Sequence, residues 1–294
     1  MTAPAAPLPL ADEAGAAKPP RRSYLRKHPS VAIGGFLLLA MIFIAVFAPL
    51  LWTVDPTAIS TARRTRVPSE LYWFGTDMLG RDIYSRVLFG ARVSLTVGLS
   101  VAIFASAAGL AIGMVSGFIR WADGILMRFM DGLMSIPPIL LAIALMALTR
   151  GSVGNVIIAI TIAEIPRVAR LVRSVVLSLR EQPYVEAAIS NGARVPRIII
   201  KHILPNTIAP MTVQATYICA SAMIIEAILS FIGAGVPPAT PSWGNIMAEG
   251  RALWQVRPHI VFFPALFLSI TVLAVNLLGD GLRDSLDPRL AKSI

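Results

Sequence analysis

The sequence predicts an all-α protein with six transmembrane helices. Of its 294 residues, 56% are hydrophobic, and the mean hydropathy is +0.72, which is typical of chains that cross a membrane several times. The apolar residues form blocks, most of them long enough to cross roughly 30 Å of hydrocarbon. Lys and Arg lie beside these blocks, so the net charge of +10 indicates loops that face the cytoplasm rather than a site for nucleic acid. The single cysteine, Cys219, excludes a disulfide framework and a cysteine metal cluster.

The N-terminal part predicts a tail followed by one span. Residues 1–23 are rich in Ala and Pro, so we expect a disordered cytoplasmic tail. The first transmembrane helix is expected within residues 24–52, where Val31–Leu51 is uncharged. The basic residues before this block indicate an uncleaved span whose N-terminus is cytoplasmic.

Residues 53–92 are expected on the extracytoplasmic side. This assignment runs against the positive-inside rule, by which Lys and Arg are enriched in cytoplasmic loops. The segment contains six arginines: Arg63, Arg64, Arg66, Arg81, Arg86 and Arg92. Asp82 and Arg86 have the i,i+4 spacing of a helical ion pair, and apolar residues lie opposite them. We therefore expect an amphipathic helix on the bilayer surface, with a structural role favoured over contact with a substrate.

Residues 93–280 are expected to form the membrane core. Val93–Phe118 predicts the second span, and glycines four residues apart within it indicate close approach of another helix. Ile125–Leu148 predicts the third span. Pro137 and Pro138 interrupt it, and either a simple kink or a break that lines a pathway would account for them. Asp131 is expected to pair with Arg128 on the surface.

The fourth apolar block, Val153–Ile165, is too short to cross a bilayer alone. Two arrangements remain open. The helix continues beyond Pro166 with Arg167 reaching the headgroups, or Glu164 is buried and faces the bundle. Arginines at three-residue spacing follow, which predicts an amphipathic helix on the cytoplasmic side.

The last two spans are expected at Thr207–Ile232 and Ile260–Leu278, with residues 281–294 as a cytoplasmic C-terminal tail. Glu226 lies within the fifth span, where a carboxylate indicates either a transport pathway or a hydrogen bond to a broken backbone such as that at Pro137. In the loop between these spans, Trp243 and Trp254 are expected to anchor the chain at the membrane interface.

A polar stretch lies between the fourth and fifth spans, in the cytoplasmic loop 166–206. A short helix-forming run is followed by Gly192, which suits the end of a helix. Pro196 suits the start of a second helix, and Pro205 is expected to mark a break before the next span. The pattern predicts two short helices, joined at a glycine, that dock onto a partner.

The same residues carry a family resemblance. Glu186-Ala187-Ala188, then Gly192, then Leu204-Pro205 resembles the EAA loop in permeases of the dipeptide/oligopeptide/nickel branch of ABC importers, and His202 replaces the more usual aliphatic residue. Two further segments, Gly75–Arg92 and Pro241–Gly244, are similar to the same branch. The resemblance implies a type I ABC importer permease bundle in a bacterial inner membrane. It also implies that the loop contacts an ATPase, through Tyr184, Glu186, Ala187, Ala188, Gly192, Leu204 and Pro205.

The function implied is that of a permease subunit for dipeptides or related small peptides, not of an enzyme. Its implied partners are a homologous permease, two cytoplasmic ATPases that bind ATP and magnesium, and an external solute-binding protein. The chain lacks a nucleotide-binding G-x-x-x-x-G-K-[ST] loop, and we expect no cofactor, metal or nucleic acid on it. The alternative is a self-sufficient secondary transporter or channel that uses Glu164 and Glu226. Among the intramembrane residues, Pro137, Pro138, Glu164 and Glu226 are candidates for a pathway or structural role.

Overall fold

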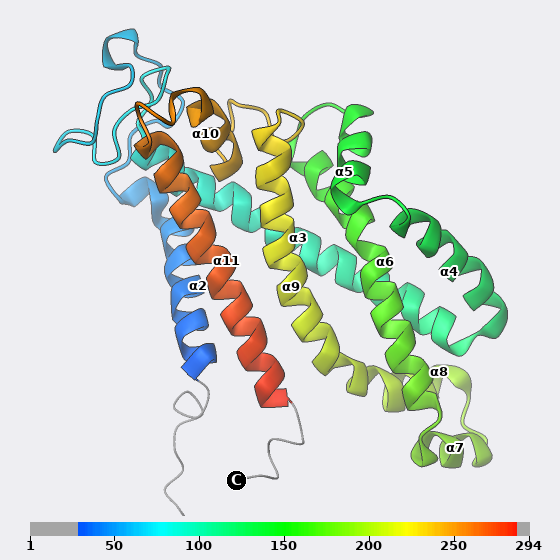
Figure 1. Cartoon of the computed structure of the whole chain (residues 1–294). Coiled ribbons are helices and arrows are strands. Elements are labelled where there is room, and N and C mark those ends of the chain that lie inside the picture. Colours follow the sequence, from blue (N-terminus) through cyan, green and yellow to red (C-terminus); the bar gives the residue numbers. More distant parts are fainter. Residues whose placement is uncertain (1–28, 287–294) are drawn as a thin grey trace, which may run out of the picture.

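The computed structural model describes residues 29–286, which form a bundle of tilted helices (Figure 1). The tail expected at 1–23 lies outside these residues, as do the last eight positions of the C-terminal tail. Within the described range the regular elements are helices, and the one β interaction is an isolated bridge between Thr76 and Asp82. The predicted all-α class is confirmed for this part of the chain.

The helices follow one another with short connections, except for the segment between α2 and α3. They are α2 (Pro29–Phe47), α3 (Ile83–Phe118), α4 (Arg120–Met134), α5 (Pro138–Ala147), α6 (Val153–Arg180), α7 (Pro183–Ser190), α8 (Val195–Ile198), α9 (Leu204–Phe231), α10 (Trp243–Gly250) and α11 (His259–Leu286).

Four stretches of the described chain are long and apolar enough to cross a membrane: Pro29–Leu50, Ile83–Phe118, Val195–Phe231 and His259–Ser285. The pair α4 and α5 makes a fifth if the two count as one broken span. Helix α6 is long enough, with 28 residues, but its charged residues give it a lower hydropathy. The structure thus supports four or five apolar spans.

The second span differs from its expected form, because Ile83–Phe118 is a single helix of 36 residues. A separate surface helix at its start was therefore a wrong expectation. Asp82 does not pair with Arg86; its carboxylate accepts the backbone N–H of Ser85 at 2.8 Å and caps α3. Arg86 is only 1% exposed, so the start of α3 is packed inside protein rather than spread on a bilayer.

Glycines on α3 set its packing against α6. A Cβ atom on Gly109, Gly113 or Gly117 would lie 2.4–2.6 Å from the Cβ of Val168, Val172 or Val176, respectively. The three pairs follow each other at four-residue steps on both helices, so the two backbones approach closely along a continuous line. The sequence prediction of a flat face on this helix is confirmed.

The third predicted span is two helices rather than one. Helices α4 and α5 meet at an angle of 86° around Pro137, so the proline pair makes a break and not a simple kink. Helix α4 lies against α6, where Asp131 accepts a hydrogen bond from Arg170 at 2.7 Å and Asp123 accepts one from Arg173 at 2.5 Å. The expected pair of Asp131 with Arg128 is therefore wrong.

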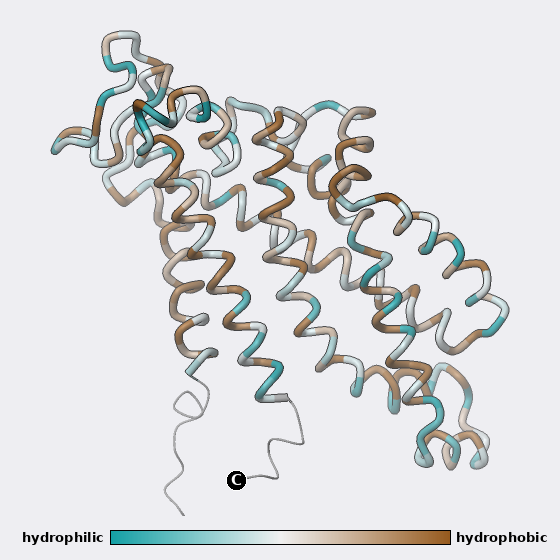
Figure 2. The backbone as a smooth tube through the Cα atoms, in the orientation of Figure 1, coloured by the Kyte–Doolittle hydropathy of each residue, from teal (hydrophilic) through white to brown (hydrophobic). Residues whose placement is uncertain are grey.

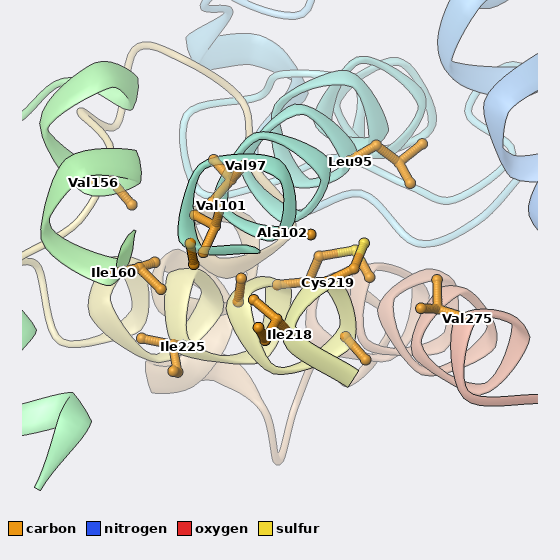
Figure 3. Close-up of a cluster of buried hydrophobic side chains, with 14 of the residues drawn as sticks. Leu95, Val97, Val101, Ala102, Val156, Ile160, Ile218, Cys219, Ile225 and Val275 are labelled. Carbon is orange, nitrogen blue, oxygen red and sulfur yellow. The ribbon is translucent and has the colours of Figure 1, made fainter. Parts of the chain in front are cut away.

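The hydrophobic core lies where α3, α6 and α9 meet (Figure 3). Val101 of α3, Ile160 of α6 and Ile218 of α9 are all fully buried there. Many other apolar side chains on the outer faces of the helices are exposed in the isolated chain, as expected for surfaces that lie against lipid or partner subunits.

Different segments of the chain lie at the two ends of the bundle (Figure 1). The segment between α2 and α3 and helix α10 lie at one end. Helices α7 and α8, the start of α2 and the end of α11 lie at the other. Figure 2 shows polar residues gathered toward both ends and apolar residues along the helices between them. Residues 181–203 of the predicted loop 166–206 and the segment 53–82 therefore lie at opposite ends of the bundle, whereas residues 166–180 belong to α6.

Candidate functional site

The docking segment has the form that the sequence predicts: α7 and α8 joined through a glycine. Gly192 has a φ of +77°, a left-handed conformation that glycine adopts without strain. Its N–H donates to Ile189 O at 2.9 Å, and the next N–H, of Ala193, donates to Ala188 O at 3.0 Å. These two bonds form the Schellman motif, which ends α7 sharply and turns the chain back toward the bundle.

Helix α7 touches the bundle on one side only. Val185 is fully buried, and Asn206 of α9 lies 3.5 Å from the hydroxyl of Tyr184. The rest of the helix is open, because Glu186 and Ala187 are exposed and Ile189 is 49% exposed. The docking segment thus presents a short helix with exposed polar and apolar groups to whatever covers this end.

The expected break at Pro205 is absent. Residues Ile199–Ile203 form a π-helical turn that joins α8 to α9 without a gap, and Pro205 lies in the first turn of α9. A proline is tolerated there because the first-turn N–H groups have no partner within the helix. Leu204 is half-buried and Pro205 is exposed, so this part of the motif continues the fifth span instead of interrupting it.

Glu226, the carboxylate in the fifth span, is completely buried. It accepts a hydrogen bond from the hydroxyl of Ser230 at 2.8 Å and from that of Ser94, on α3, at 3.3 Å. The structure therefore gives it a hydrogen-bonded place between α3 and α9. The broken backbone at Pro137, which the sequence suggested as one of its alternatives, is not among its contacts.

Glu164 has different surroundings. It is 1% exposed and lies on α6, which continues unbroken through Pro166. The helix thus continues beyond Pro166 and Glu164 is buried, but Arg167 pairs with Glu164 and was not found to reach the headgroups. Glu164 lines a cavity with Pro138, at the start of α5, so two of the four intramembrane candidates lie together, away from the serines that hold Glu226.

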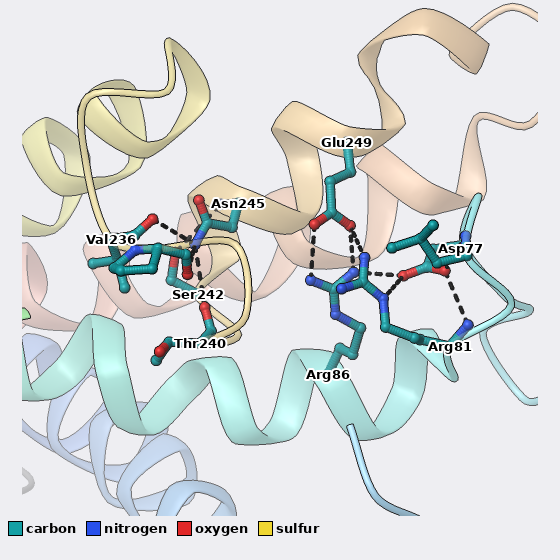
Figure 4. Close-up of polar contacts among 10 residues, drawn as sticks. Asp77, Arg81, Arg86, Val236, Thr240, Ser242, Asn245 and Glu249 are labelled. Atoms are coloured by element: carbon teal, nitrogen blue, oxygen red, sulfur yellow. Dashed lines mark hydrogen bonds and ion pairs between the residues drawn. The ribbon is translucent and has the colours of Figure 1, made fainter. Parts of the chain in front are cut away.

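The sequence did not reveal a polar network at the opposite end of the bundle (Figure 4). Arg86 of α3 donates to Asp77 and to Glu249 of α10, each at 2.5 Å. Arg81 also bonds to both carboxylates. Asp77 and Arg86 are almost completely buried. The excess of arginines in residues 53–92 is the one sequence feature that could have suggested buried partners, but Arg86 and Glu249 are too far apart in the sequence for their contact to be anticipated.

Trp243 also has a role that the sequence did not predict. It is fully buried, and its indole N–H donates to Val87 O at 3.0 Å. The expectation that it anchors the chain at the membrane interface is wrong, whereas Trp254 is 61% exposed. Ser242 caps α10, and Asn245 donates to carbonyls of the loop before it. Together with the arginine network, these contacts hold α10 firmly on α3.

Comparison with known proteins identifies the family. Residues 109–292 match the model of the binding-protein-dependent transport system inner membrane component. Residues 22–68 match the N-terminal transmembrane domain of oligopeptide transport permease C. The first match covers the helices α4 to α11, including the docking segment.

Curated relatives agree along almost the whole chain. A probable peptide ABC transporter permease of Sinorhizobium fredii is 54% identical over 264 residues, which cover 90% of both chains. The dipeptide transport permease DppC of Alkalihalophilus pseudofirmus is 40% identical and covers 96% of this chain and 94% of its own. The glutathione transport permease GsiD of Pectobacterium atrosepticum is 42% identical, with coverages of 92% and 90%.

The fold also matches a solved transporter. A chain of the MetNI methionine ABC transporter, determined in inward-facing conformations, aligns with a TM-score of 0.57 at 21% identity, over 68% of this chain and 96% of its own. This likeness supports the importer fold independently of sequence. The chain therefore belongs to the family of binding-protein-dependent transport system inner membrane components, and it is a permease subunit of an ABC importer.

Proposed function

We propose that this chain crosses the inner membrane six times, with both ends in the cytoplasm, and forms half of the passage of a peptide importer. The other half would be a homologous permease, most simply in a heterodimer. Two cytoplasmic ATPases would bind ATP and magnesium, and an external binding protein would deliver the cargo. Peptide cargo is supported by relatives named for peptide, dipeptide and glutathione transport.

The observation that carries this proposal is the position of α7. It projects from one end of the bundle, with Val185 buried beneath it and Glu186 and Ala187 exposed. Its two neighbours in the chain are α6 and, through α8 and the π-helical turn, α9. A partner that binds α7 is therefore connected to the ends of both α6 and α9.

Movement of α7 would spread through the bundle by contacts already described. Helix α6 packs on α3 along the glycine line, and α9 meets both in the core. Closely packed helices transmit displacement because they have no free volume to absorb it. Closure of the ATPase pair on ATP binding would thus tilt α6 and α9 together and change the side on which the passage is open.

A cross-linking experiment tests the contact with the ATPase. In a Cys219→Ser background, a cysteine at Ala187 should cross-link to an ATPase subunit in the assembled complex, and a cysteine at Ser69, in the segment at the opposite end, should not. Gly192 supplies a functional test on the same helix. Gly192→Val strains the left-handed turn, whereas Gly192→Asn tolerates it.

We expect Gly192→Val to reach the membrane at normal levels but to lose peptide uptake by about tenfold or more, since roughly 1–2 kcal/mol of strain per residue is enough to displace α7. Gly192→Asn should retain most uptake. No structural clash confuses the comparison, because a Cβ on Gly192 meets nothing within 4 Å. Wild-type uptake in Gly192→Val, together with no cross-link from any exposed position of α7, would contradict the proposed coupling.

A further inference from the structure

A cavity of about 310 Å³ opens between α5, α6, α9 and α11. Its polar groups come from three helices: Glu164 and Arg167 on α6, Tyr217 and Ser221 on α9, and Asn276 on α11. Apolar side chains from α5 and α9 form the rest of the wall. The volume is at the lower end of the range of about 300–1,000 Å³ that small-molecule sites occupy.

The carboxylate of Glu164 is unsatisfied in this cavity. The residue is 1% exposed, and neither oxygen has a well-aligned hydrogen-bond donor within the described part of the chain, although the hydroxyl of Ser221 lies near the carboxylate. Arg167 Nη1 lies 3.1 Å from Oε2, which gives an ion pair but not the alignment of a hydrogen bond. A buried carboxylate with poorly aligned donors is unfavourable, so this arrangement suits a group that receives further donors from a ligand.

Three other carboxylates in and beside the spans have hydrogen-bond donors within the protein. Glu226 accepts from two serine hydroxyls. Asp131 and Asp123, on α4, each accept from an arginine of α6. Glu164 differs from all three, because it is buried, faces a cavity and has an incomplete set of donors. The ion pair with Arg167 therefore leaves the carboxylate of Glu164 able to accept further hydrogen bonds from the cavity.

Arg167 can move away from Glu164. Its side chain is 37% exposed, and its guanidinium lies over the ring of Tyr217, 5.4 Å from the centroid. A guanidinium can leave a poorly aligned pair and still keep a cation–π contact with the tyrosine. It can then form a bidentate pair with a carboxylate of the ligand. The cavity thus offers one anionic and one cationic group side by side.

These features match a zwitterion with a primary ammonium group, which brings three N–H donors on a compact head. We propose that Glu164 binds the terminal ammonium of a peptide during its passage, while Arg167 turns to the terminal carboxylate of the shortest peptides. The apolar wall, including Ile139 and Ile224, would contact the peptide side chains. The identity of the ligand rests on the proposed peptide-import function; the preference for an ammonium rests on the cavity.

Protection of a cysteine in the cavity tests this site. The variant Ser221→Cys, in the Cys219→Ser background, is assembled with its partner permease and ATPases in nanodiscs. The rate of its modification by a small neutral thiol reagent is measured without nucleotide and again with ATP and vanadate. The probes are the dipeptide alanyl-alanine and its N-acetyl derivative, which has no ammonium, each at millimolar concentration without the binding protein.

We expect alanyl-alanine to slow the modification at least about threefold in one of the two states, and N-acetyl-alanyl-alanine to have no effect. Glu164→Gln should abolish the protection, because the amide lacks the charge, and Glu164→Asp should retain part of it. Glu226→Gln, the matched control, should retain all of it. Equal protection by the two probes, no protection in either state, or protection that survives Glu164→Gln would overturn the proposal.

The ammonium site and the peptide-import function can be contradicted separately. If α7 cross-links to the ATPase and peptide uptake occurs but no ammonium-dependent protection is seen, the chain is a peptide importer without this site. If alanyl-alanine protects through its ammonium but the transporter takes up no peptide, the ammonium site stands, and the proposed peptide cargo is wrong.

Discussion

At the scale of single residues, two arginine–carboxylate contacts differ in burial and therefore in expected strength. Arg86 and Asp77 are 1% and 0% exposed, whereas Arg170 and Asp131 are 53% and 60% exposed. Removing Arg86 leaves Asp77 with only Arg81 as a cationic partner and removes one of the two arginines that hold α10 through Glu249. Loss of one partner from a buried pair costs about 3–5 kcal/mol, whereas an exposed pair contributes about 0–1 kcal/mol.

We therefore predict that Arg86→Met lowers the unfolding temperature of the purified complex markedly, and that Arg170→Met changes it little. Thermal unfolding of the two variants side by side checks this prediction, with binding-protein-stimulated ATP hydrolysis as a second readout. Similar small effects for both would mean that water reaches Asp77 and Arg86, and that the network does not hold α10 on α3.

At the scale of helices, the same substitution has opposite expected effects on α3 and α4. A Cβ on Gly113 would lie 2.5 Å from Val172 Cβ and 2.7 Å from a backbone oxygen of α6, but one on Gly124 meets nothing within 4 Å. Gly113→Ala should destabilise the protein by about 1–3 kcal/mol, because neither neighbour can move away easily. Gly124→Ala should stabilise α4 by about 0.5–1 kcal/mol, since alanine favours the helix.

Unfolding temperatures of the two alanine variants check the prediction, and uptake adds a functional measure. If the two helices slide along the glycine line during transport, Gly113→Ala should also slow uptake by more than its effect on protein level. A neutral Gly113→Ala would show that α3 and α6 lie farther apart in the assembled transporter than in the isolated chain.

At the scale of the whole molecule, the two ends of the bundle predict opposite sides of the membrane. Ser69 lies in the segment before α3, and Ser178 lies near the end of α6 that leads into α7; both are exposed. In a Cys219→Ser background, single cysteines at these positions should respond differently to an impermeant thiol reagent on intact cells. Ser69→Cys should be labelled, and Ser178→Cys should be labelled only after the cells are lysed.

The reverse pattern would invert the topology and place α7 outside, where no ATPase could reach it. Labelling of both positions in intact cells would show instead that the membrane is leaky to the reagent. The wild-type chain sets the background of labelling, because its Cys219 is 5% exposed and should remain unlabelled. The arginines of residues 53–92 would oppose the expected orientation only if they were free charges. Two of them, Arg81 and Arg86, are buried in ion pairs, whereas Arg63, Arg64 and Arg66 are exposed.

The sequence by itself determined those features that depend on neighbours along the chain. The apolar blocks, the glycine line on α3, the turn at Gly192 and the end of α9 at Phe231 follow from local periodicity and from the backbone freedom of particular residues. The family resemblance at Glu186–Pro205 is local in the same sense. For this reason the all-helical class and the docking segment were predicted with nearly the right bounds.

Tertiary structure alone decided which polar groups meet. Arg86 binds Glu249 instead of Asp82, Asp131 binds Arg170 instead of Arg128, and Trp243 is buried on Val87 O instead of lying at the membrane interface. It also separated the two intramembrane glutamates, giving Glu226 its serine partners and leaving Glu164 at a cavity. The physical reason is that a polar side chain buried in a bundle needs a partner wherever the fold supplies one, and helices far apart in sequence supply most of them.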